Sequence, residues 1–195
     1  MKKTIFSLII LLLITLSLCA QENSAGNNNS NSDRNYLIVY YSWSGNSRII
    51  ANKLHSILNC DIVEILPSTP YTTDYNTMLN VAQREISAID ASGSYPAISN
   101  NIESFRDFES IFICYPLWWS RMATPVQSFL HKHKDKLNSK RISLVCTSGR
   151  SGITQTVADA RRICPDSVIT EALHIKSANV ANAQNLLTQW MEAMK

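Results

Sequence analysis

The chain lacks an excess of charge of one sign. Its 195 residues include 18 basic and 15 acidic side chains. Two of the basic ones, Lys2 and Lys3, lie in a leader that we expect to be removed, which leaves 16 against 15. This balance, together with the lack of a lysine or arginine stripe, argues against a nucleic-acid partner.

Several motifs of well-known chemistry are also missing. No Cys-x-x-Cys spacing occurs, so the sequence supports neither a thioredoxin-type site nor a cysteine-rich iron–sulfur centre. No Gly-Lys-Ser/Thr occurs, which excludes a Walker nucleotide loop. We expect the cysteines of the folded part to be buried small hydrophobic residues. They are Cys60, Cys114, Cys146 and Cys164.

Glycine is scarce, with five residues at positions 26, 45, 93, 149 and 152. So few glycines should stand where the backbone needs a positive φ or must approach a ligand closely.

Histidine is rare too, with four residues. His131 and His133 are two apart, which separates them by about 200° on a helix. We therefore expect a surface pair rather than a metal site.

Length and composition indicate one domain with its own core. Hydrophobic residues make up 45% and aromatic residues 8% of the chain, which excludes wholesale disorder. A length of 195 residues is too short for two comfortable domains.

Residues 1–19 have the pattern of a secretory signal peptide. A basic start precedes an apolar stretch at residues 4–18, which is short for a membrane span of about 20 residues. The end of this stretch resembles a bacterial lipoprotein signal with Cys19 as the lipidated residue, whereas ordinary cleavage near Cys19 or Ala20 would release a soluble protein. Residues 20–35 form an Asn- and Ser-rich tether that cannot build a core. We expect an exported protein of the cell envelope, on the periplasmic side, held by a lipid anchor alone.

Apolar runs and helical stripes alternate along residues 36–195. Strands are expected at 36–41, 61–66, 110–115, 142–146 and 168–173, with Pro116 stopping the third. Helices are expected at 46–58, from Pro125, from Ile153 to Ile163, and up to Met194. This alternation predicts an α/β fold of three layers, with a five-stranded parallel sheet in the order 2-1-3-4-5.

One segment does not fit a simple crossover. Residues 67–101 are long for a connection and contain a helical pattern near 76–89. We interpret them as an inserted helical segment after the second strand.

The loops that follow the first, third and fourth strands carry the chemistry. The first is Ser-Trp-Ser-Gly-Asn-Ser at 42–47, before a helix, where backbone N–H groups and hydroxyls can bind a phosphate. The second contains Trp118 and Trp119, an aromatic platform or a partner surface. The third is Thr-Ser-Gly-Arg-Ser-Gly at 147–152. Together they indicate a site for a planar ring that bears a phosphate.

These loops, in this order, resemble the flavodoxin family. They are most similar to a bacterial flavodoxin-like branch with Tyr-Pro-x-Trp-Trp and Thr-x-Gly-x-Ser-Gly loops. Residues 71–75 and 164–166 resemble that branch as well. The resemblance runs from about Tyr36 to the C-terminus and implies a flavodoxin-like fold with bound flavin mononucleotide (FMN).

The resemblance also implies which residues contact FMN. The phosphate is held in the first loop by Ser42, Ser44, Gly45, Asn46 and Ser47, and Trp43 also contacts the cofactor. The isoalloxazine ring is lined by Pro116, Leu117, Trp118 and Trp119. Its polar edge is bordered by Thr147, Ser148, Gly149 and Gly152, with Arg150 close to the N1–O2 edge. For Tyr71 and Tyr75 two interpretations remain, covering the flavin and packing in the core.

The expected function is redox chemistry, in which FMN does the chemistry and no side chain is needed as acid, base or nucleophile. Electron transfer and quinone-reductase-like reduction are both consistent with this expectation. Export favours a quinone or a membrane-bound electron carrier as the redox partner. The alternative is a flavin-less binding or surface module that retains the fold.

Overall fold

The computed structural model describes residues 35–170 and 172–194. The predicted signal peptide, the lipidation site Cys19 and the tether up to residue 34 lie outside the described residues. Among the helices described, none is both long and apolar enough to cross a membrane.

A parallel sheet forms the centre of the domain. Its strands run in the order β2-β1-β3-β5-β6, and β7 also pairs in parallel with β5. This confirms the predicted order, with β6 and β7 sharing the fifth position. The bounds are β1 Tyr36–Tyr40, β2 Asp61–Glu64, β3 Ser110–Trp118, β5 Arg141–Ser148, β6 Val168–Ile169 and β7 Leu173–Lys176. A short strand, β4 Arg121–Met122, turns back antiparallel to the end of β3.

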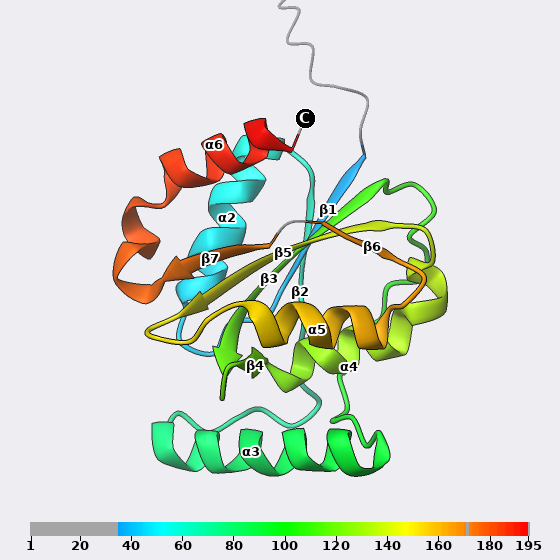
Figure 1. Cartoon of the computed structure of the whole chain (residues 1–195), viewed down its shortest axis with the longest axis vertical. Helices are drawn as coiled ribbons and strands as arrows, with labels where there is room; N and C mark the ends of the chain where they lie inside the picture. Colours follow the sequence, from blue (N-terminus) through cyan, green and yellow to red (C-terminus); the bar gives the residue numbers. More distant parts are fainter. Residues whose placement is uncertain (1–34, 171, 195) are drawn as a thin grey trace, which may run out of the picture. The chain divides into compact units, whose positions relative to one another are not determined.

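Helices cover both faces of the sheet (Figure 1), as the alternation predicted. Helices α2 and α6 lie on one face, and α4 and α5 lie on the other. Their bounds are α2 Asn46–Leu58, α4 Thr124–His133, α5 Thr154–Ile163 and α6 Gln184–Ala193, with 3₁₀ turns η1 Lys134–Leu137 and η2 Ser177–Asn182.

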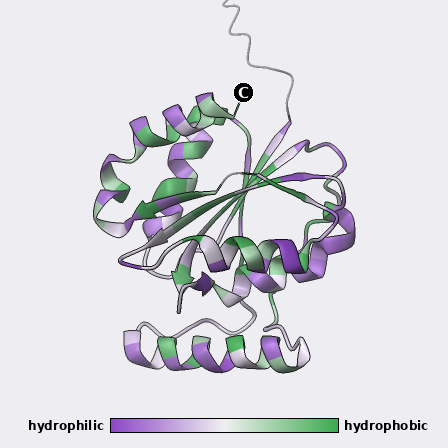
Figure 2. Cartoon of the chain, in the orientation of Figure 1, coloured by the Kyte–Doolittle hydropathy of each residue, from purple (hydrophilic) through white to green (hydrophobic). Residues whose placement is uncertain are grey.

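Burial on both faces explains the unbroken apolar strands. In β1, Leu37 and Val39 join the core under α4 and α5, whereas Ile38 and Tyr40 join the core under α2 and α6. A strand covered on both sides has no polar face, so its sequence does not alternate. Figure 2 shows the result, with hydrophobic colour along the central strands and mixed colour on the helices. Cys114 and Cys146 are buried in this sheet as expected, and both are free thiols.

The third strand does not stop at Pro116, as the sequence suggested, but runs on to Trp118. The N–H of Tyr41, just past β1, donates to the carbonyl of Cys114 at 3.0 Å. Alternate residues of a strand direct their backbone groups to the same side. Pro116 therefore faces the side where β1 has ended, and its missing N–H is not needed there.

The fifth strand is also not continuous. Ile169 pairs with Ile142, and Leu173 pairs with Val145. Between these two pairs the chain advances four residues from β6 to β7 but only three along β5. The register therefore shifts by one residue between β6 and β7. Between them the N–H of Thr170 donates to the carbonyl of Ile142 at 3.0 Å.

The predicted inserted segment is confirmed as helix α3, Tyr75–Ser92. It begins where Asp74 accepts a hydrogen bond from the N–H of Thr77 at 2.8 Å. In Figure 1 the helix lies across the end of the sheet toward which β3 points. This position places α3 opposite the carboxyl edge, where ligands of such sheets bind.

The expected surface pair of histidines is wrong for His133. His131 is exposed and stacks on Tyr95, with 4.1 Å between the ring centroids. His133 is buried between Phe105 and Phe129, and neither of its nitrogens has a hydrogen-bond partner. Position 133 lies seven residues after Val126, so the helical period places it on the buried face with Val126 and Phe129, and the comparison of His133 with His131 alone did not show this.

Burial of His133 makes the stability of the fold depend on pH. Burial, assisted by Lys132 and Lys136, lowers the pKa of His133 to about 4. In the unfolded chain its pKa is about 6.5. The stability of the folded protein therefore does not depend on this histidine above about pH 6.5. As the pH falls from about 6.5 to about 4, the free energy of unfolding decreases by on the order of 3 kcal/mol.

Urea unfolding between pH 7.5 and 4 measures this effect. We expect His133→Leu to show a markedly smaller loss of stability over this range than the wild type. The exposed His131→Leu serves as the control and should keep the wild-type slope. Equal slopes for all three proteins would contradict the assignment.

Candidate functional site

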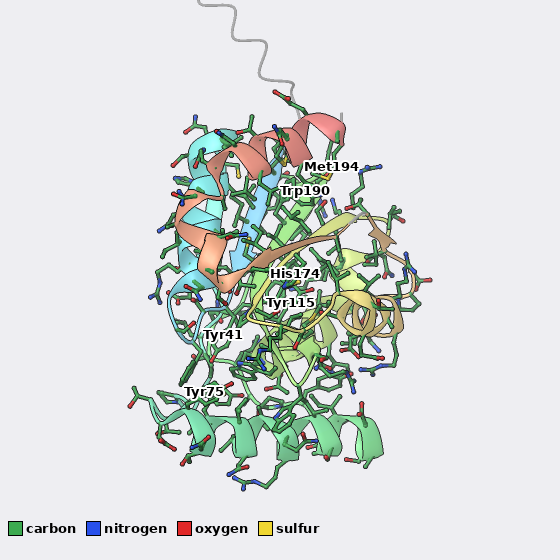
Figure 3. All side chains as sticks on the ribbon, turned by 60° about the vertical axis from the view of Figure 1, so that its left-hand side comes forward. Tyr41, Tyr75, Tyr115, His174, Trp190 and Met194 are labelled. Atoms are coloured by element: carbon green, nitrogen blue, oxygen red, sulfur yellow. The ribbon has the colours of Figure 1, made fainter. Side chains whose placement is uncertain are left out.

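A groove lies between the carboxyl edge of the sheet and α3. It consists of a smaller cavity of about 240 Å³ and a larger one of about 580 Å³. Both cavities are lined by Tyr75, Leu79, Leu117, Ser148 and Gly149. Figure 3 shows Tyr75 at the start of α3 and Tyr41 just past β1; Tyr75 lines the groove, whereas Tyr41 is buried behind it.

Ten of the residues expected at the site line this groove. In the smaller cavity they are Trp43, Ser44, Asn46, Pro116, Leu117, Trp118, Thr147, Ser148 and Gly149, and Trp119 lines the larger one. Four lie outside the lining, namely Ser42, Gly45, Ser47 and Gly152. The three loops therefore meet as the sequence indicated.

The first loop has the features of an anion-binding site. Gly45 directly precedes α2 with φ +92°, a left-handed conformation that favours glycine. No side chain caps the helix, and its first turn contains no acidic residue. The hydroxyl of Ser42 is buried and has no hydrogen-bond partner. Free N–H groups at a helix start beside an unused hydroxyl can bind a phosphate.

Two of the expected ligand hydroxyls instead bind each other. The Oγ of Ser47 lies 2.9 Å from the Oγ1 of Thr147, and both residues are buried. This bond joins the first loop to the third across 100 residues of sequence. Its role is to hold the two loops in register.

The two adjacent tryptophans have different roles. Trp118 is only 4% exposed and packs edge-on against Tyr41 and Tyr71, with 5.6 and 5.0 Å between ring centroids. Trp119 is 52% exposed, and its indole N–H donates to the carbonyl of Leu79 on α3 at 3.0 Å. Trp118 thus lies mostly in the core at the edge of the smaller cavity. Of the two tryptophans, Trp119 has the more accessible indole for a ligand.

Of the two interpretations for Tyr71 and Tyr75, core packing holds for the first residue, and the second residue faces the groove. Tyr71 packs in the core, and its hydroxyl donates to Glu85 Oε2 at 2.6 Å. Burial, helped by this carboxylate, raises the pKa of Tyr71 above its usual value. Tyr75 is 58% exposed and lines both cavities. Tyr75 is therefore the one of the two that can cover a ligand.

The third loop carries a polar pair that the sequence did not reveal. Ser148 Oγ lies 2.8 Å from Nε2 of His174 on β7 and 3.0 Å from the carbonyl of Ser151. The register shift before β7 brings His174 into this position. Arg150 lines the larger cavity, as expected from its place in the loop.

Apart from Tyr75, sequence reasoning missed the lining that comes from α3 and η2. Met78 and Leu79 of α3 and Ser177 of η2 line the smaller cavity. Met78 belongs to a buried stripe with Ala82, Ile86 and Ile89. That stripe was visible as a helical pattern, but nothing in it indicated that the helix packs against the site.

Comparisons with known proteins agree with this arrangement. The sequence model of the family described as Flavodoxin matches residues 35–194. A crystal structure of a candidate flavoprotein from Bacteroides uniformis has a TM-score of 0.66 at 20% identity, covering 80% of this chain and 98% of that one. A flavoprotein from Lactobacillus acidophilus in complex with FMN has a TM-score of 0.62 at 21% identity, covering 78% and 99%. The curated proteins include no match to this chain.

The strain at Gly45 gives a direct test of the first loop. A Cβ at Gly45 would meet nothing within 4 Å, so the effect of Gly45→Ala comes from the backbone alone. We expect a loss of about 1–2 kcal/mol in the free energy of unfolding. Gly152→Ala has equal space and no positive φ, and should change stability by less than about 0.5 kcal/mol. Similar urea midpoints for the two variants would contradict the loop geometry.

Proposed function

The chain belongs to the flavodoxin family, and from this premise we propose that it is an FMN-binding redox protein of the cell envelope. The groove at the carboxyl edge of the sheet is the FMN site. The physiological reaction is electron transfer or the reduction of a quinone-like acceptor.

The observation that supports this proposal best is the uncapped start of α2, which opens into a groove with aromatic walls. Its smaller cavity is lined by Ser44 and Asn46 at the uncapped start of α2. Its larger cavity is lined by Trp119, Tyr75 and Leu117. The start of the helix suits a phosphate, and the aromatic side chains suit a flat ring. The FMN complex of the Lactobacillus acidophilus neighbour supports the same cofactor.

Within this proposal, the chain binds and orients FMN. The loop at 42–47 binds the phosphate, while Trp119 and Tyr75 exclude water from the ring. Bound FMN would supply the electron-transfer chemistry. None of the residues that line the groove is required as an acid, base or nucleophile in this role.

The proposed redox partner is a small quinone or a membrane-bound electron carrier. The exposed faces of Tyr75 and Trp119 leave an aromatic rim on the larger cavity. An apolar planar acceptor is compatible with such a rim. The near-balanced charge of the domain does not favour docking on a strongly basic protein. The predicted leader supports a location in the cell envelope, where soluble cytosolic electron donors do not reach the protein.

The proposal is tested on the purified full-length chain. We expect a yellow protein that absorbs near about 450 nm, as flavins do, and that releases FMN on acid denaturation. The flavin-free protein should bind FMN at least about tenfold more tightly than riboflavin, because riboflavin lacks the phosphate that the loop at 42–47 binds. A colourless protein that binds neither flavin would contradict the proposal and favour the flavin-less module.

Arg150 should set the potential of the bound flavin. It lines the larger cavity, and a guanidinium near an anion stabilises the charged state. Full reduction places negative charge on FMN, so Arg150→Ala should lower the potential of the second electron by tens of millivolts. Solvent screening limits the size of the effect. Arg150→Lys should retain most of it.

Anaerobic redox titration measures these potentials. The control is Arg161→Ala, which removes an exposed arginine from the last turn of α5 that lines neither cavity. It should leave both potentials unchanged. If Arg150→Ala behaves like this control, Arg150 does not tune the flavin.

A further inference from the structure

The turn between β3 and β4 has an unusual backbone. Trp118 pairs with Arg121, so Trp119 and Ser120 alone form the loop. Both have positive φ, +52° for Trp119 and +62° for Ser120. Two-residue hairpin loops of this kind prefer Asn-Gly, because in the left-handed conformation Cβ crowds the backbone carbonyl, a contact that glycine lacks and asparagine tolerates. Neither residue here is glycine or asparagine, so the turn is strained.

The residue that follows the turn makes an extensive set of ion pairs. The Nε of Arg121 donates to both carboxylate oxygens of Asp159 on α5, at 2.7 and 3.0 Å. Its two Nη atoms donate to the two oxygens of Asp90 on α3, at 2.9 and 3.0 Å. The Asp159 side chain is 1% exposed. These carboxylates raise the pKa of Arg121, which remains charged.

Arg121 therefore ties β4 to α3 and α5 at once. The same turn carries Trp119, whose indole N–H donates to Leu79 of α3, and both turn residues line the larger cavity. A strained turn persists only where its surroundings hold it, and such turns cluster at ligand sites. In the described residues, the fixed points of this turn are the guanidinium and the indole bond.

We infer that Arg121 is a positioning residue, which holds the strained Trp119–Ser120 turn so that the Trp119 indole forms one wall of the FMN ring site. The inference rests on the proposed function for the identity of the ligand. Without the ion pairs the turn relaxes toward a negative φ and the indole leaves the wall. Trp119 touches the ligand, whereas Arg121 acts through the turn.

The indole position is measured first, in the full-length protein without flavin. NMR detects the Trp119 indole N–H, which the bond to Leu79 shields from exchange with water. We expect Arg121→Gln to remove this protection. Adding Ser120→Gly should restore it, because glycine adopts φ +62° without strain. This measurement does not depend on FMN, so it separates the positioning role from the proposed function.

FMN affinity is measured on the same proteins. Arg121→Gln should weaken binding at least tenfold, and Arg121→Gln with Ser120→Gly should recover most of the loss. The control is Arg162→Gln, whose guanidinium also approaches Asp159, at 3.6 Å, but does not adjoin the turn. It should keep wild-type FMN affinity and indole protection. Unchanged protection and affinity in a folded Arg121→Gln protein would overturn the inference, as would a failed rescue by Ser120→Gly.

A milder variant covers the case in which Arg121→Gln does not fold. Asp90 is the more exposed partner of Arg121, so Asp90→Asn removes charge from the network at its solvent side. We expect faster exchange of the Trp119 indole and a several-fold loss of FMN affinity. Wild-type values for both would likewise overturn the inference.

Discussion

The site depends on the parallel register of β1, β3 and β5. Because these strands run in one direction, their carboxyl ends bring three loops to one edge of the sheet. The bond between Ser47 and Thr147 then fixes two of those loops to each other. Burial on both faces makes this sheet rigid, since its residues are packed between two helical layers. The loops can therefore hold a geometry that none of them has alone.

The inserted segment turns this edge into a groove. The indole N–H of Trp43 donates to the carbonyl of Thr72, and that of Trp119 donates to the carbonyl of Leu79. Both acceptors belong to the segment between β2 and β3. The indoles thus link loops of the sheet to the inserted segment, Trp43 just before α3 and Trp119 on α3 itself. Arg121 adds a charged link to α3 through Asp90. The ligand site is accordingly shared between the basic fold and its insertion, and neither part forms it alone.

Much of the fold could be predicted from the sequence, because local patterns and packing agree there. Helix α2 has the predicted bounds, Asn46–Leu58, and the strand order follows from the alternation. What escaped prediction depends on contacts between distant segments. Pro116 is accommodated because β1 ends beside it, which no local pattern shows. His174 reaches Ser148 because the register shifts by one residue between β6 and β7. His133 is a different case, because its spacing from Val126 and Phe129 already placed it on the buried face of α4. The loops of the site were found because their residue types are unusual, whereas the lining from α3 resembles ordinary core.

A crystal structure of the full-length chain grown with FMN tests the central claim most directly. The account predicts the phosphate against the backbone N–H groups at the start of α2, near Ser44 and Asn46. It predicts the isoalloxazine ring in the larger cavity, between Trp119 and the loop that contains Gly149 and Arg150. A phosphate outside the loop at 42–47, or a ring that does not enter the space between α3 and the carboxyl edge of the sheet, would contradict the account.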